Sequence, residues 1–195
     1  MVSHDHTAVE ESQAIALAKT GDQQACAALI ARYKHMVHTV TFRVLRNGMD
    51  AEEATQDTFV KALRQLNTFQ GGGKFSTWLY SIAYRTALTA LRKRKTDTYS
   101  LDCLNPDQAE LQRESTFPDQ DRKAALEHAL ATLPPEDAAI VTMYHLEEMS
   151  LEEIVTVTGL GASNVKVKLH RSRKRLHEAL HRLLKDELWT LSANT

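Results

Sequence analysis

The sequence predicts an all-α protein made of two small helical domains that are joined by a flexible linker, with a helix-turn-helix in the second. Apolar residues recur at spacings of three and four in both halves of the chain, which is the amphipathic helix pattern. With 7 glycines and 4 prolines among 195 residues, the chain has too few turn residues for a β-sandwich or barrel. The helical pattern is lost between about residues 96 and 122, where polar residues dominate.

The first domain, residues 1–95, is predicted to consist of four helices. The apolar repeat breaks at Gly21-Asp22, which supplies a helix stop and the N-cap of the next helix. This second helix ends near Asn47-Gly48, and Asp50 is predicted to cap the third. The third helix carries the apolar residues Ala54, Phe59, Val60, Leu63 and Leu66. A glycine-rich loop over 70–74 then leads into a long helix from about 76 to 94.

Residues 96–122 are predicted to form an acidic linker, residues 123–184 a second helical domain, and residues 185–195 a tail with no clear role. The stretch 101–137 holds nine acidic and three basic residues. Pro134-Pro135 begins a helix whose predicted core residues are Ile140, Val141, Met143, Tyr144 and Leu146. Ser150 and Glu153 have the spacing of a capping box at the start of a short helix. A tight turn over 158–162 and a long basic helix from Ser163 complete a helix-turn-helix pattern.

The long basic helix has two faces with different chemistry. Between residues 163 and 182 it holds seven Lys or Arg residues and one Glu. At about 100° per residue, one stripe is predicted to pack inward: Val165, Leu169, Ser172 and Leu176. The opposite stripe holds Ser163, Asn164, Val167, His170, Arg171 and Lys174, and the flanks hold Lys166, Lys168, Arg173 and Arg175. This layout predicts a helix that reads base edges in the major groove while its flanking cations neutralise phosphates; the alternative is a solvated basic face.

A second basic patch ends the first domain. Arg85 and residues 92–95 contribute five positive charges, and no acidic residue lies between Lys74 and Lys95. The same helix carries four aromatic residues, Phe75, Trp78, Tyr80 and Tyr84. Rings that stack on bases beside cations that meet phosphates are typical of single-stranded nucleic-acid binding. Core packing of Trp78, Leu79 and Ile82 is the alternative interpretation.

Two stretches of the chain resemble the sigma factors of bacterial RNA polymerase, specifically the extracytoplasmic-function (ECF) group. The second conserved region of that family is similar to residues 50–95, DAEEATQDTFVKALRQLNTFQGGGKFSTWLYSIAYRTALTALRKRK. The fourth is similar to residues 133–176, LPPEDAAIVTMYHLEEMSLEEIVTVTGLGASNVKVKLHRSRKRL. The resemblance implies a protein that directs core polymerase to specific promoters and assists promoter melting, with no covalent chemistry of its own.

The resemblance implies a role for each of three sets of residues. Core polymerase would be bound by Asp50, Glu53, Gln56, Asp57 and Phe59. The minus-ten promoter element would be recognised and melted by Lys74, Phe75, Trp78, Tyr80, Tyr84, Arg85 and Arg92. The minus-thirty-five element would be read by Ser163, Asn164, Lys166, Val167, Lys168, His170, Arg171, Arg173 and Lys174. The family often has Asn and Asp where this chain has Arg85 and Thr89, so the minus-ten base preference stays open.

The partners that the resemblance implies are core RNA polymerase, promoter DNA and an anti-sigma factor that holds the protein inactive. No cofactor and no metal are expected. A cytoplasmic location without membrane insertion is expected, because the first residues lack an apolar signal segment and no 18-residue apolar run occurs. The two cysteines, Cys26 and Cys103, form no CxxC pair, which excludes a disulfide scaffold.

Other interpretations explain less of the sequence. The histidine pairs His4/His6, His35/His38 and His177/His181 lack a third metal ligand, although the last pair has helical ligand spacing. Gly71-Gly72-Gly73-Lys74 lacks the spacing of a phosphate-binding loop. The main alternative is an autonomous helix-turn-helix regulator that binds DNA as a dimer without polymerase, and a pure protein-interaction module would leave both basic patches unexplained.

The net charge of −1 argues against a protein that is basic along its whole length. The near-neutral sum hides two basic helices, which the acidic linker and the acidic polymerase-facing surface offset. We therefore predict weak autonomous affinity for DNA, with binding conferred once polymerase separates and positions the two helices.

Overall fold

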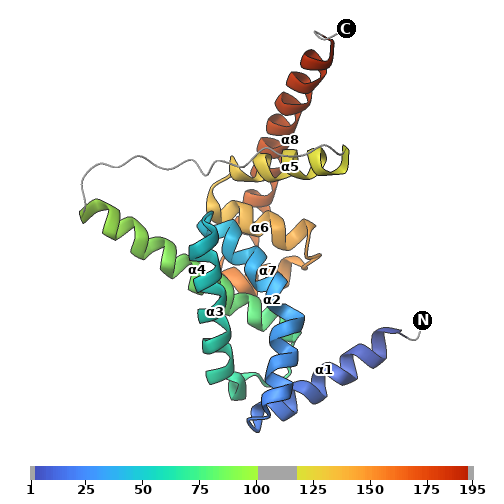
Figure 1. Ribbon diagram of the computed structural model, residues 1–195, viewed down its shortest axis with the longest axis vertical. Coiled ribbons are helices and arrows are strands. Elements are labelled where there is room, and N and C mark those ends of the chain that lie inside the picture. Colours follow the sequence, from blue (N-terminus) through green and yellow to red (C-terminus); the bar gives the residue numbers. More distant parts are fainter. Residues whose placement is uncertain (1–2, 101–117, 193–195) are drawn as a thin grey trace. The chain divides into compact units, whose positions relative to one another are not determined.

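The computed structural model describes residues 3–100 and 118–192, with side chains described for residues 10–94 and 124–183. Within these residues the chain forms eight α-helices, one short 3-10 helix and no strand, which confirms the predicted all-α class. The chain divides into two compact units, residues 1–96 and 97–195. The first contains α1 (Ser3–Lys19), α2 (Gln23–Leu45), α3 (Gly48–Arg64), η1 (Leu66–Thr68) and α4 (Phe75–Ser100); the second contains α5 (Pro118–Ala131), α6 (Pro135–His145), α7 (Leu151–Thr158) and α8 (Ala162–Ser192) (Figure 1).

Short polar breaks separate the first three helices. Asp22 is the N-cap of α2, as predicted, and its carboxylate accepts a hydrogen bond from the Ala25 backbone N–H at 2.7 Å. The N-cap of α3 is Asn47 rather than the predicted Asp50, because the Asn47 side chain accepts from the Asp50 backbone N–H at 3.0 Å. Asp50 instead lies in the first turn of α3, where a negative charge interacts favourably with the helix dipole.

The core of the first unit forms between α2, α3 and α4. Val37, Val40 and Val44 on α2 have no exposed surface. The Tyr33 ring of α2 packs against the Phe75 ring of α4 with centroids 5.4 Å apart. On the α3 side, the Lys61 ammonium donates a hydrogen bond to the Thr86 hydroxyl at 3.3 Å. Since α4 contacts both neighbours, six consecutive residues of it, 79–84, are buried.

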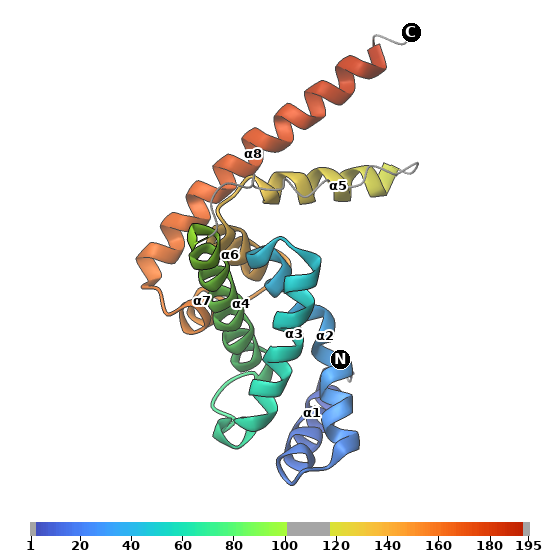
Figure 2. The ribbon, with the colours of Figure 1, turned by 60° about the vertical axis from the view of Figure 1, so that its left-hand side comes forward.

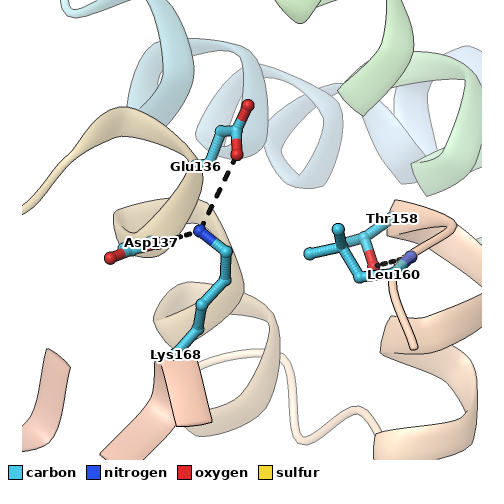
Figure 3. Close-up of polar contacts among 5 residues, drawn as sticks. All are labelled: Glu136, Asp137, Thr158, Leu160 and Lys168. Carbon is cyan, nitrogen blue, oxygen red and sulfur yellow. Dashed lines mark hydrogen bonds and ion pairs between the residues drawn. The ribbon is translucent and has the colours of Figure 1, made fainter. Parts of the chain in front are cut away.

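The second unit is built around a helix-turn-helix formed by α7 and α8. The predicted capping box is present: the Glu153 N–H donates to the Ser150 hydroxyl at 3.2 Å, and the Ser150 N–H donates to the Glu153 carboxylate at 2.8 Å. α7 ends at Gly159, whose φ of 72° lies in the left-handed region that favours glycine. Within this turn the Leu160 N–H donates to the Thr158 hydroxyl at 3.3 Å (Figure 3). The turn therefore leads directly from α7 into α8.

Three helices extend beyond the bounds that the sequence predicts. α4 continues to Ser100 and α5 begins at Pro118, so both ends of the predicted linker over 96–122 are helical; residues 101–117, Cys103 among them, lie outside the described residues. No glycine or proline interrupts the chain between residues 74 and 105, which explains why α4 runs on. α8 likewise continues through most of the predicted tail, to Ser192 (Figure 2). Leu146, predicted as a core residue, is 50% exposed because it follows the last turn of α6.

Candidate nucleic-acid interface

α8 has one buried and one exposed face, as the helical spacing predicts. Val165, Leu169 and Ser172 are between 0% and 6% exposed and form the face that packs into the unit. The residues on the outer side are exposed: Ser163, Asn164, Lys166, Val167, His170, Arg171, Arg173 and Lys174. Hydroxyl, amide and cationic groups of this kind hydrogen-bond to base edges and phosphates, and an exposed valine can contact a thymine methyl. The exposed face of α8 therefore has the chemistry that a major-groove helix needs.

Lys168 differs from the other cations of α8. Its Nζ lies 2.6 Å from Asp137 Oδ1 and 3.8 Å from Glu136 Oε2, both in the first turn of α6 (Figure 3). The Asp137 side chain is only 11% exposed. Contrary to the prediction that Lys168 contacts DNA, its ammonium is occupied within the unit, because this flank of α8 faces the acidic start of α6. The ion pair links α8 to α6.

The opposite flank of α8 borders a small cavity of about 150 Å³. Its lining combines apolar surface from Tyr144, Leu151 and Leu169 with the cationic or titratable side chains of Lys166, His170 and Arg173. These three residues lie one helical turn apart on α8, so their polar ends gather on one side of the helix. This flank is suited to a phosphate that approaches beside the base-reading face.

Most of the predicted aromatic surface of α4 is not on the surface. Phe75, Tyr80 and Tyr84 are 4%, 1% and 2% exposed, so their rings have no open face on which a base could stack. The prediction that these three rings contact the minus-ten element is therefore not supported. The physical reason is that α4 packs against α2 and α3 at once, which turns its aromatic residues into core residues.

Trp78 and several cations remain on the surface of α4 and its preceding loop. Trp78 is half-buried, and Lys74, Arg85, Arg92 and Lys93 are exposed. Trp78 lies at the edge of an aromatic cluster made of Tyr33, Phe69, Phe75 and Trp78, in which its ring is 5.6 Å from Phe69 and 5.4 Å from Phe75. One partly open ring beside several cations is a smaller surface than predicted, but it has the same chemical character.

α3 carries the residues expected to meet polymerase. Glu53, Gln56 and Asp57 are exposed, whereas Asp50 pairs with Arg94 of α4 at 3.0 Å. Phe59 is 9% exposed and belongs to the core, so a direct contact to polymerase through this ring is not supported.

Sequence reasoning missed two exposed apolar residues of α3. Met49 is 83% exposed and Val60 is 47% exposed, although Val60 fits the apolar pattern of the helix. The positions 49, 53, 56 and 60 follow one another at spacings of four, three and four. Met49 and Val60 therefore lie on the same stripe of α3 as Glu53 and Gln56. This spacing is the signal in the sequence that could have found them.

The remaining candidate sites are weak in the described part of the chain. His177 and His181 have ring centroids 6.2 Å apart, but no group of three metal-ligating side chains occurs among the described residues. Cys26 is half-buried, with its thiol 4.0 Å from the Ala18 carbonyl oxygen, and Cys103 lies outside the described residues. None of the described helices is both long and apolar enough to span a membrane.

Known sequence families match both units. The family model of Sigma-70 region 2 matches residues 29–96, and that of Sigma-70 region 4 matches residues 123–176. The chain is 28% identical over 179 residues to the ECF RNA polymerase sigma factor SigW of Bacillus subtilis, which covers 85% of this chain and 94% of the relative. It is 32% identical over 169 residues to the ECF RNA polymerase sigma factor SigE of Mycolicibacterium smegmatis. That match covers 83% of this chain and 65% of the relative.

Two solved structures share the fold. One is the sigma factor RpoE in complex with the anti-sigma factor NepR from Bartonella quintana, with a TM-score of 0.63, 20% identity, and 80% of this chain and 96% of that chain covered. The other is CnrH in complex with the cytosolic domain of CnrY, with a TM-score of 0.61, 22% identity, and 87% and 96% covered. The region 4 match contains the helix-turn-helix, and the region 2 match contains α3 and the described side chains of α4. With both regions present in order and relatives matched over most of its length, the chain belongs to the ECF group of the sigma factors of bacterial RNA polymerase.

Proposed function

We propose that this sigma factor reads the minus-thirty-five element with the exposed face of α8. The observation that carries the proposal is the division of α8 into a face that is at most 6% exposed at Val165, Leu169 and Ser172 and a face of exposed polar and cationic residues. Base-edge readout falls to the outer stripe, and Lys166 and Arg173 on the flank neutralise phosphates. Lys168 is excluded from the DNA-contacting set because it pairs with Asp137.

The minus-ten element is held by the surface that α4 leaves open. Lys74, Arg85 and Arg92 meet the phosphates of the melted strand, and Trp78 supplies the ring on which one base stacks. Extruding a base costs a few kcal/mol, and one stacking contact returns about 1–3 kcal/mol. Promoter melting is then differential binding: the open strand is bound better than the paired duplex, with polymerase contributing the rest.

Core polymerase docks on the exposed stripe of α3. Glu53, Gln56 and Asp57 give this stripe acidic and amide groups, and Met49 and Val60 add exposed apolar surface to it. Acidic groups around exposed apolar side chains suit the basic clamp helices of the largest polymerase subunit, to which the family resemblance points. Asp50 contributes indirectly, through its ion pair with Arg94.

An anti-sigma factor controls the protein. The similarity to RpoE, whose structure is a complex with the anti-sigma factor NepR, supports this part of the proposal. A tagged copy recovered from unstressed native cells is expected to carry a partner that suppresses transcription in the reconstituted system. Recovery of polymerase subunits alone would argue against such control.

Reconstituted transcription tests the promoter-recognition proposal. Transcript start sites are mapped after overexpression, and a mapped promoter is then transcribed by purified core polymerase with and without this chain. We expect transcription that depends on the chain, and its loss in the double variant Arg171→Ala, Lys174→Ala, both exposed on α8. Lys34→Ala, at an exposed position of α2, is the matched control and is expected to retain transcription.

One outcome would contradict the proposal that this chain acts as a sigma factor. If the chain binds the mapped duplex specifically without polymerase and does not bind core polymerase, it acts as an autonomous helix-turn-helix regulator, and the proposal fails.

A further inference from the structure

Two side-chain contacts fasten α1 to the rest of the first unit. Near the middle of α1, the Glu11 carboxylate accepts a hydrogen bond from the Tyr33 hydroxyl at 2.6 Å and lies 3.3 Å from the Arg32 guanidinium. At the end of α1, the Lys19 ammonium donates to the Phe69 backbone carbonyl at 2.6 Å and lies 5.9 Å from the Phe69 ring centroid. Both contacts are partly buried, which strengthens their electrostatic component relative to a contact in water.

The two contacts meet the two sides of the aromatic cluster. Glu11 holds Tyr33, whose ring packs against Phe75 at 5.4 Å. Lys19 holds Phe69, whose ring packs against Phe75 at 5.3 Å and against Trp78 at 5.6 Å. The chain of contacts therefore runs from α1 through the half-buried ring of Phe69, which packs on the buried ring of Phe75, to Trp78, the half-buried ring at the edge of the cluster.

The Lys19 contact lies at the end of η1, where the Phe69 N–H also donates to the Leu66 carbonyl at 3.1 Å. Phe69 directly follows η1 and precedes the loop of three glycines, which have no side chains to pack and whose α-carbons face open space. A charged donor on the Phe69 carbonyl fixes the start of this loop. At the other contact, burial together with the hydrogen bond to Glu11 raises the pKa of the Tyr33 hydroxyl.

We propose that Lys19 is a positioning residue for promoter melting: it holds Phe69, and through Phe69 the ring of Trp78, in the orientation that receives an unstacked base. The inference rests on the proposed role of Trp78 at the minus-ten element. Lys19 lies outside the stretch matched by Sigma-70 region 2, residues 29–96, so this role belongs to α1 as an addition to the matched region.

The test compares Lys19→Met, which keeps the apolar stem and removes the donor, with Lys34→Met at an exposed position of α2. The chain has two tryptophans, Trp78 and Trp189. Both variants also carry Trp189→Phe, so that the fluorescence comes from Trp78 alone. Acrylamide quenching reports the exposure of Trp78 in the full chain. In the reconstituted holoenzyme, permanganate reactivity of unpaired thymines reports open complex on the mapped promoter as duplex, and run-off transcription reports activity on the same promoter with a preformed bubble.

Lys19→Met is expected to increase quenching of Trp78 and to lower open complex on the duplex by about ten- to a hundredfold, the range for losing one hydrogen bond to a charged group. On the bubble template, where the cost of unpairing is already met, its activity is expected to return to that of Lys34→Met. Lys19→Arg, which retains a donor, is expected to recover most of the open complex.

Two results would overturn the inference. One is an unchanged open-complex level and unchanged quenching in Lys19→Met. The other is an equal loss on duplex and bubble, which indicates a general structural role. If Lys19→Met fails to fold, Lys19→Gln, which removes the positive charge and shortens the reach of the donor, decides between the same outcomes. Failure of the underlying role of Trp78 is distinguishable, because Trp78→Ala would then leave the permanganate reactivity of the holoenzyme on the duplex unchanged.

Discussion

α4 and α8 look alike in the sequence and differ in the structure. Both are long helices that carry a concentration of positive charge, and both are expected to meet DNA. On α8 the predicted outer stripe is exposed, and on the flanks only Lys168 of the predicted DNA-contacting residues pairs within the unit. On α4, six consecutive residues from Leu79 to Tyr84 are buried, and three of the four predicted DNA-contacting rings belong to the core.

The difference teaches that helical periodicity assigns faces only to a helix that is packed on one side. α8 packs against α5, α6 and α7 with its buried face, and its outer stripe stays exposed. α4 is covered from more than one direction, by Tyr33 of α2 and by Lys61 of α3, and no single stripe describes its buried residues. The exposed cations of α4, such as Arg85 and Arg92, lie outside this contact.

Removing a ring of α4 gives the largest expected effect. Tyr80→Ala leaves a cavity at a position that is 1% exposed and is expected to lower the free energy of unfolding of the first unit by about 3–5 kcal/mol. Urea unfolding followed by Trp78 fluorescence in the Trp189→Phe chain measures it. If stability is unchanged while open-complex formation is lost, Tyr80 acts on DNA after all, and the contrast between the two helices disappears.

Breaking the ion pair between Lys168 and Asp137 gives the second largest expected effect. Lys168→Met leaves the Asp137 carboxylate, 11% exposed, without its partner at 2.6 Å and is expected to cost about 2 kcal/mol of stability. The dependence of promoter affinity on salt is expected to stay unchanged, because no phosphate contact is lost. Circular dichroism during urea unfolding and promoter binding at several salt concentrations measure the two quantities.

Asp137→Asn on α6 is the matched control for the ion pair. It is expected to lower stability in the same way, and the double variant is expected to lose less than the sum of the single losses. A reduced salt dependence in Lys168→Met alone would show that Lys168 leaves Asp137 and binds a phosphate in the complex.

Lys166→Met is the counterpart on the exposed flank of α8. Lys166 lines the cavity beside His170 and Arg173, and its removal is expected to leave stability nearly unchanged. Removing one duplex phosphate contact reduces the slope of log affinity against log salt by about 0.9. Binding of the reconstituted holoenzyme to the mapped promoter between low and moderate salt measures this slope, and an unchanged slope would place Lys166 away from the DNA backbone.

Local sequence signals predicted the helices and their polar ends well. The Asp22 cap and the Ser150–Glu153 capping box are formed by residues a few positions apart, so the sequence alone determines them. The choice between Asn47 and Asp50 as N-cap was wrong because either residue is a suitable cap and the backbone path decides between them. The outer face of α8 was predictable because one stripe of this helix stays exposed, and helical spacing alone assigns the residues of a stripe.

Features that depend on distant segments were not predictable from periodicity. Phe59, Tyr80 and Tyr84 are buried because α2, α3 and α4 meet, and nothing in the local pattern of α4 reports the position of Tyr33 or Lys61. The pairing of Lys168 with Asp137 joins residues 31 positions apart. Lys19 and Phe69, 50 positions apart, meet only through the fold.

The smallest expected effect belongs to a cation that α4 leaves exposed. Arg85→Ala is expected to change the stability of the first unit by less than about 0.5 kcal/mol, because the side chain is exposed and no core contact is lost. If Arg85 meets the melted strand, the slope of log open-complex formation against log salt falls in magnitude by about 0.7. This is the value for losing one phosphate contact on a single strand. Permanganate reactivity at several salt concentrations measures it, with Lys34→Ala as the exposed control. A large loss of stability in Arg85→Ala would mean that α4 has no side free for DNA at this position, and its likeness to α8 would then be confined to the sequence.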